Sequence, residues 1–124
     1  MNIAGFKKLM IWERSMALTA DIYKLTEKFL PDNEKFGLIS QMRRCSVSIP
    51  SNIAEGYGRF SDTEMAHFLR IARGSLYELV TQSTLCFMLG FFPQEVINKI
   101  DGEAEEIDRM MISFINQLEN KQYK

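Results

Sequence analysis

Residues 43–59 read RRCSVSIPSNIAEGYGR and place a proline inside a helical pattern. Pro50 has no backbone N–H, and its ring presses on the carbonyl of Ser46, so a helix through this point is expected to kink. Alternatively, one helix ends near Ile49 and another begins at Pro50, because proline is favoured in a first turn. We expect the freed backbone groups to bond to nearby short polar side chains, namely Ser46, Ser48, Ser51 and Asn52.

Helical periodicity continues on both sides of this stretch and predicts an all-α protein. Apolar residues recur every three, four or seven positions in four segments, at about 9–29, 34–57, 62–89 and 93–119. Ser61 and Glu64 form a capping-box pattern at the start of the third segment. Because the connecting segments are short, we expect an antiparallel up-down-up-down four-helix bundle, formed by one domain over residues 1–124.

The first helical segment carries two apolar stripes rather than one. The stripes consist of Leu9, Trp12, Met16, Tyr23 and Leu30, and of Ile11, Leu18, Ile22, Leu25 and Phe29. One stripe would face the bundle core. The other either widens the buried face within one chain or contacts a partner subunit, and the sequence alone favours neither reading.

Composition favours an ordinary globular protein of the cytoplasm. The 124 residues are 46% hydrophobic and 25% charged, with a net charge of −1. Two cysteines without a CxxC pattern are typical of reduced thiols in a cytosolic protein. We see no signal-peptide pattern and no run of eighteen apolar residues, so no membrane association is expected.

Basic residues gather in the middle of the chain. Residues 35–77 hold six basic and three acidic side chains, whereas residues 78–124 hold four basic and eight acidic ones. The candidates for binding RNA or DNA phosphates are Arg43, Arg44, Arg59, Arg70 and Arg73. The competing interpretation, which the near-neutral charge favours, is that these arginines pair with Glu55, Asp62, Glu64 and Glu78.

The sequence predicts no catalytic, cofactor or metal site. A Glu-x-x-His spacing occurs once, at Glu64 and His67, but His67 is the only histidine and a di-metal bundle needs two such pairs. The serines around Pro50 have no histidine close in sequence. Hydrogen bonding within the helix is therefore their expected role.

These features together resemble a known family. The matching residues are Tyr23 with Leu25-Thr26, Gln41 with Arg43-Arg44, the run Ser48-Ile49-Pro50-Ser51-Asn52-Ile53-Ala54-Glu55-Gly56, Gly58-Arg59, and Gly74-Ser75-Leu76 with Glu78-Leu79. The chain resembles, from about Phe6 to about Leu118, the four-helix bundle proteins encoded by intervening sequences in 23S ribosomal RNA genes. This group is related to the accessory variability determinants of diversity-generating retroelements.

The resemblance implies a homopentamer of antiparallel four-helix bundles with no known catalytic activity. Retroelement members bind nucleic acid through strongly basic surfaces, which this nearly neutral sequence lacks. Pro50, Asn52, Glu55, Gly56 and Gly74 form an assembly signature. Within it, we expect Asn52 and Glu55 to fix packing through buried hydrogen bonds, and Gly74 to let another helix approach.

Overall fold

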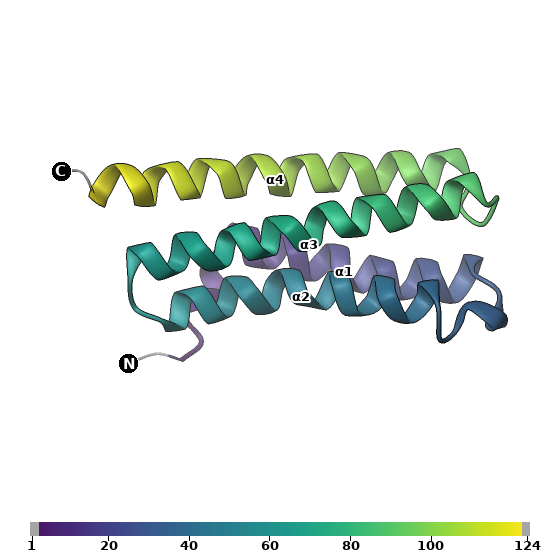
Figure 1. Ribbon diagram of the computed structural model, residues 1–124, viewed down its shortest axis with the longest axis horizontal. Coiled ribbons are helices and arrows are strands. Elements are labelled where there is room, and N and C mark those ends of the chain that lie inside the picture. Colours follow the sequence, from purple (N-terminus) through teal and green to yellow (C-terminus); the bar gives the residue numbers. More distant parts are fainter. Residues whose placement is uncertain (1–2, 123–124) are drawn as a thin grey trace.

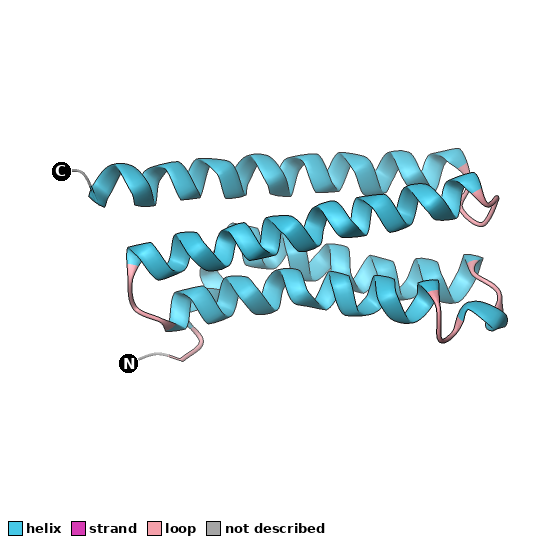
Figure 2. Cartoon of the chain, viewed as in Figure 1, coloured by secondary structure: helices cyan, strands magenta, loops and turns pink. Residues whose placement is uncertain are grey.

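Helices make up almost all of the described chain. The computed structural model describes residues 3–122, in which four long helices follow one another without any strand (Figures 1 and 2). They are α1 (Met10–Phe29), α2 (Leu38–Gly58), α3 (Asp62–Met88) and α4 (Gln94–Gln122). Two short 3-10 helices, Gly5–Lys8 and Asp32–Glu34, precede α1 and α2. The prediction of an all-α four-helix protein is confirmed.

Consecutive helices run in opposite directions and lie side by side (Figure 1). Packing joins α1 to α2, α2 to α3, α3 to α4 and α4 back to α1, with no diagonal packing between described residues. The seam between α2 and α3 is the most extensive, and that between α1 and α4 the least. The predicted up-down-up-down bundle is therefore present, and its α1–α2 side lies opposite its α3–α4 side.

The start of α2 differs from the prediction. We expected helix from about residue 34, but α2 begins at Leu38. Pro31 has extended backbone and is followed by a single 3-10 turn, Asp32–Glu34. Gly37 then has backbone angles outside the helical region, with φ −106° and ψ −113°. Apolar spacing alone could not detect this turn, because Phe36 fits the helical period although its side chain is 91% exposed.

α2 passes through Pro50 without interruption. The alternative of two separate helices meeting at Pro50 is therefore wrong. The kink expected at this point stays a prediction.

The start of α3, the end of α3 and the start of α4 are explained by residues next to each of these helix ends. The Ser61 side chain accepts a hydrogen bond from the backbone N–H of Glu64 at 3.3 Å, which is one half of the predicted capping box. After α3, Gly90 has φ +84°, a conformation that glycine adopts without steric cost. α4 starts at Gln94, directly after Pro93 and one residue later than the predicted segment 93–119.

One apolar core runs the length of the bundle. Its least exposed large side chains come from all four helices and include Leu18, Ile22, Met42, Ile49, Ile53, Leu69, Leu76, Leu79, Ile100, Ile107 and Met111. The α1 stripe that faces this core is the one with Ile11, Leu18 and Ile22. No helix in the described part of the chain is long and apolar enough to span a membrane.

Candidate functional site

The carbonyl freed by Pro50 bonds to another helix. Without an N–H at Pro50, the carbonyl oxygen of Ser46 loses its helical donor. The hydroxyl of Thr19, on α1, lies 2.9 Å from that oxygen and 2.8 Å from the carbonyl oxygen of Ser15. Ser46 instead donates its hydroxyl to the carbonyl of Arg43. Of the nearby polar side chains that we expected to compensate for Pro50, none bonds to the Ser46 carbonyl.

A polar cluster of signature residues lies in the seam between α2 and α3. The hydroxyl oxygens of Ser48 and Ser75 are 2.8 Å apart. The Asn52 side-chain amide donates to the Ser48 carbonyl at 2.8 Å and lies 3.0 Å from its hydroxyl oxygen. All three residues are half-buried. The Asn52 amide is therefore already engaged within α2, and the bond that crosses to α3 is the one between Ser48 and Ser75. The role expected for Asn52 in fixing packing stays a prediction.

Gly56 lies where α2 and α3 approach closely. A Cβ at this position would lie 2.8 Å from the Cβ of Phe68 and 3.1 Å from the sulfur of Met65. Any larger residue would push the two helices apart. Gly56 is thus required for packing inside one chain.

Gly74 has the opposite surroundings. It lies in the middle of α3, and an added Cβ would meet no atom within 4 Å. A mid-helix glycine costs about 1 kcal/mol relative to alanine. Contacts within the chain give no reason for it, so Gly74 leaves open surface where another chain can approach.

Glu55 does not form the buried hydrogen bonds that we expected. Its side chain is 51% exposed and pairs with Arg59 at 2.8 Å, one turn further along α2. The position explains this difference, because Glu55 projects away from the core while Ile53 and Gly56 face it. The guanidinium of Arg59 also lies over the ring of Phe68.

Both cysteines are buried thiols. Burial, followed by the nearby Glu78 carboxylate, raises the pKa of Cys45 to about 12. Burial, with a contribution from Glu34, raises the pKa of Cys86 to about 11. Since the thiolate is the reactive form, neither cysteine is suited to act as a nucleophile.

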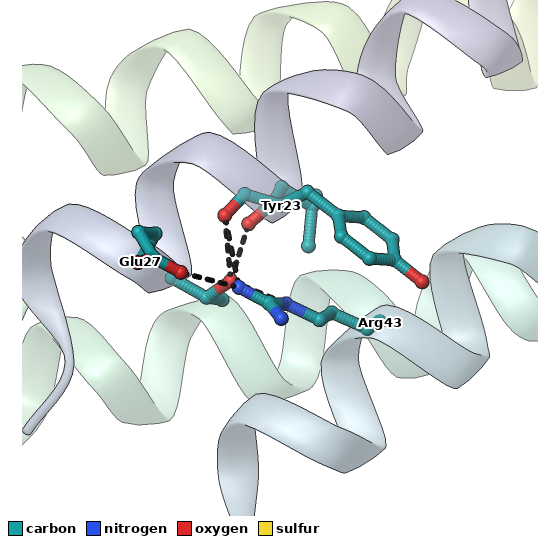
Figure 3. Close-up of polar contacts among 5 residues, drawn as sticks. Tyr23, Glu27 and Arg43 are labelled. Carbon is teal, nitrogen blue, oxygen red and sulfur yellow. Dashed lines mark hydrogen bonds and ion pairs between the residues drawn. The ribbon is translucent and has the colours of Figure 1, made fainter. Parts of the chain in front are cut away.

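Arg43 joins α2 to α1 (Figure 3). Its guanidinium donates to the Thr26 hydroxyl at 3.1 Å and to the Tyr23 carbonyl at 3.2 Å, and it pairs with Glu27 at 3.4 Å. It also lies over the Tyr23 ring, 4.6 Å from the centroid. Arg43 therefore directs its guanidinium to α1, and its side chain is only 27% exposed.

Three of the other candidate arginines also have acidic partners within the chain. Arg59 pairs with Glu55, as one interpretation predicted, while Arg70 pairs with Glu119 and Arg73 with Asp108 on α4. Arg44 makes no ion pair or side-chain hydrogen bond with the described residues. The four paired arginines therefore direct their guanidinium groups to acidic side chains on α1, α2 and α4.

The α1 stripe with Trp12, Met16 and Tyr23, which does not face the core, belongs to an outer apolar band. Together with neighbouring α2 residues, it forms a strip of half-exposed side chains on the α1–α2 side, here called the α1–α2 band. The band consists of Trp12, Met16, Tyr23, Val47, Ala54 and Tyr57. Met16, Tyr23, Val47 and Tyr57 are between 39% and 43% exposed. This outer stripe is therefore not simply a wider core face.

An open groove lies on the opposite side, between α3 and α4. Its volume is about 350 Å³, and its apolar floor consists of Leu76, Val80 and Ala104. Its rim consists of Tyr77, Thr84, Asp101, Glu105 and Asp108. Sequence reasoning did not identify this groove.

The rim carboxylates differ in their environments. Burial would raise the pKa of Asp108, but hydrogen bonds from Arg73 at 2.6 Å and Tyr77 at 2.8 Å outweigh burial and lower it. Burial, followed by repulsion from Glu105, raises the pKa of Asp101. One buried carboxylate oxygen of Asp101 has no hydrogen-bond partner.

No cluster of three or more His, Cys, Asp or Glu side chains among the described residues could hold a metal ion. His67 is exposed, and its ring packs against Phe68, with 5.3 Å between centroids. Glu64 lies in the first turn of α3 beside the Ser61 cap.

Comparison with known proteins agrees with this architecture. A family model described as 23S rRNA-intervening sequence protein matches residues 7–113. The chain belongs to this family. The matched residues include the whole assembly signature, from Pro50 to Gly74, as the resemblance predicted.

A solved relative has the same fold. It is a protein of unknown function from the S23 ribosomal protein family of Bacteroides thetaiotaomicron, with a TM-score of 0.77 and 26% sequence identity. The similarity covers 86% of this chain and 95% of the relative. No curated protein matches the sequence.

Proposed function

We propose that this protein is a non-catalytic scaffold that assembles with copies of itself through the α1–α2 band. The observation that carries this proposal is the exposure of apolar side chains at helical spacing on two helices that pack together. Single exposed apolar residues are common on protein surfaces, whereas a contiguous apolar strip marks an interaction surface. Four of its side chains remain about 40% exposed although the core beneath them is complete.

The state of the polar groups supports a non-catalytic role. Ser48, Asn52 and Ser75 bond to one another, and the buried thiols of Cys45 and Cys86 have raised pKa values. A nucleophile needs a base within hydrogen-bond reach. None of these serine and cysteine side chains bonds to histidine among the described residues.

The family resemblance supplies the expected number of subunits. It implies a homopentamer, and closed rings with more than two subunits use two different surfaces of each copy. The α1–α2 band would provide one of them.

Light scattering after size exclusion tests the proposal. The intact protein is expected to elute as a five-chain assembly, and Val47→Glu to shift it toward the monomer because a charge would be buried in the interface. Phe36→Glu is the control, since Phe36 is exposed but precedes α2 and lies in neither the band nor α3. A monomeric wild-type protein at micromolar concentration would overturn the proposal.

Binding of RNA or DNA through Arg43, Arg44, Arg59, Arg70 and Arg73 is the competing function. The ion pairs of four of these arginines argue against it, because each would have to exchange an existing partner for a phosphate. Retention on heparin at low salt, lost in Arg44→Ala, would favour the competing function instead.

A further inference from the structure

We infer that the groove between α3 and α4 receives the α1–α2 side of the next copy, with Arg44 of that copy placed against Asp101 and Glu105. The inference rests on the proposed scaffold function and extends it, because it names the second surface of the contact and the charges that set its register.

The groove offers an apolar floor and one exposed aromatic side chain on its otherwise polar rim. Leu76, Val80 and Ala104 form the floor, and the Tyr77 side chain at the rim is 54% exposed. Ile112, 40% exposed, follows one turn beyond Asp108 on α4. A half-exposed apolar helix face such as the α1–α2 band could bury Val80, Tyr77 and Ile112 together with its own side chains.

Charge on the groove is left uncompensated. Asp108 is neutralised by Arg73, but Asp101 and Glu105 form no ion pair with any described residue. Asp101 also has a buried oxygen without a hydrogen-bond partner, and burial costs a charged carboxylate energy. The groove therefore favours the approach of a cation.

The opposite side of the molecule presents such a cation. Arg44 is the candidate arginine without an ion-pair partner in the described chain, and it precedes Val47 of the α1–α2 band by three residues on α2. Residues three apart on a helix are surface neighbours. The α1–α2 side therefore carries apolar surface beside the positive charge of Arg44. The α3–α4 side carries apolar surface beside the negative charges of Asp101 and Glu105.

Gly74 gives room for the contact. It lies on α3, three residues before Tyr77, and has no atom within 4 Å of an added Cβ. A glycine three residues from the rim residue Tyr77 lets the backbone of an incoming helix approach closely beside the groove. The mid-helix glycine, unexplained within one chain, thus has a role between chains.

The geometry fits a head-to-tail contact. Because diagonal helices do not pack among the described residues, the α1–α2 side and the α3–α4 side face away from each other. A contact between two different sides repeats around a ring, whereas a two-fold dimer would pair one side with itself.

Charge reversal tests the inference, with native mass spectrometry measuring assembly against concentration. Arg44→Glu alone, and Asp101→Asn with Glu105→Lys alone, should each raise the apparent dissociation constant at least about tenfold, since like charges would face each other. One chain carrying all three changes should return to within about threefold of wild type, because the opposite charges face each other again.

Lys28→Glu is the matched control. Lys28 is exposed near the end of α1, away from both the band and the groove, and its reversal should leave assembly unchanged. Circular dichroism of every variant at low concentration checks that the monomer remains helical.

The outcomes separate the two proposals. A wild-type protein that stays monomeric overturns the scaffold function and this inference with it. An assembling wild type whose assembly tolerates both charge reversals, or whose combined variant fails to recover, overturns the inference and leaves the scaffold function standing.

Discussion

The two glycines of the assembly signature differ in whether their surroundings leave room for a side chain: Gly56 has none, and Gly74 has open space. Gly56→Ala should destabilise the fold by about 1–3 kcal/mol, because its Cβ would overlap Phe68. Gly74→Ala should stabilise the isolated chain by about 1 kcal/mol, because alanine favours helix and nothing lies nearby. Urea denaturation of both variants measures the difference. Equal effects would show that helix propensity alone governs both sites.

The hydrogen bond between Thr19 and the Ser46 carbonyl compensates for Pro50. Thr19→Val should cost about 1–3 kcal/mol, because it leaves a buried carbonyl without a donor. In a Pro50→Ala background the same change should cost less, since alanine at position 50 would restore the backbone N–H. A double-mutant cycle measures this coupling. Additive effects would mean that Thr19 serves only its own helix through Ser15.

Residue-level reasoning from sequence identified the freed carbonyl but not its partner. Serines and Asn52 close in sequence were the natural candidates, yet the donor is Thr19, 27 positions away. Such a partner depends on how α1 and α2 are aligned, which one sequence does not specify. For Glu55, the sequence showed a polar residue on a helix but not that its side chain lies outside the seam.

The seam between α3 and α4 carries two carboxylates of opposite behaviour. The pKa of Asp108 is lowered, so its contribution to stability is present above the ordinary carboxyl pKa and is lost as pH falls through its folded-state pKa. Asp108→Asn should therefore cost about 1–3 kcal/mol near pH 7 and much less in acid, once Asp108 itself is protonated. Thermal unfolding of the wild-type protein and of Asp108→Asn, measured from pH 7 into the acid range, checks this pH dependence.

Asp101 should show the reverse dependence. Its pKa is raised, so its charge costs stability at pH values above the folded-state pKa, and protonation removes that cost as pH falls. Asp101→Asn should consequently stabilise the monomer at pH 7, and the gain should shrink in acid. A loss of stability at pH 7 would indicate that the carboxylate has an essential partner. The measurement uses dilute protein, so that assembly does not contribute.

Arg43 binds α1 to α2 through several contacts at once. Arg43→Lys keeps the charge but loses the guanidinium hydrogen bonds to Thr26 and Tyr23, and should cost about 1–3 kcal/mol. Arg44→Lys, at a position without an ion-pair partner in the described chain, is the matched control and should leave the melting temperature unchanged. Equal melting temperatures for the two variants would contradict the structural role of Arg43.

Helices were predictable as elements because amphipathic periodicity and end signals agree. The predicted bounds of the first, third and fourth helices differ from those of α1, α3 and α4 by at most three residues. The start of α2 was predicted four residues too early, since Phe36, between the 3-10 turn and α2, fits the helical spacing of apolar residues. Backbone angles at Gly37, which break the helix, have no signature in spacing.

For the whole molecule, assembly predicts a melting temperature that depends on concentration. If the native state is a ring of copies, dilution shifts mass action toward separate and less stable chains. The melting temperature should fall measurably over a hundredfold dilution, and Val47→Glu should abolish that dependence. An unchanged wild-type melting temperature would mean that the single bundle accounts for all the stability measured.

Sequence reasoning identified the outer stripe of α1 but could not choose between its two explanations. The choice needs the exposed fraction of Met16 and Tyr23, which depends on where α2 lies. The groove between α3 and α4 had no sequence signature, because it depends on side chains from two helices whose alignment no short motif records.

The antiparallel order of four helices brings both described ends of the chain to the same end of the bundle (Figure 1). A short flexible linker could therefore join them, and the chain could be reopened in the connection between α2 and α3. Such a circular permutant would begin with the present α3 and turn the sparsely packed α1–α4 neighbours into a covalent hairpin. In a ring of copies, peptides fused to either original terminus would all project from one rim and form a dense array.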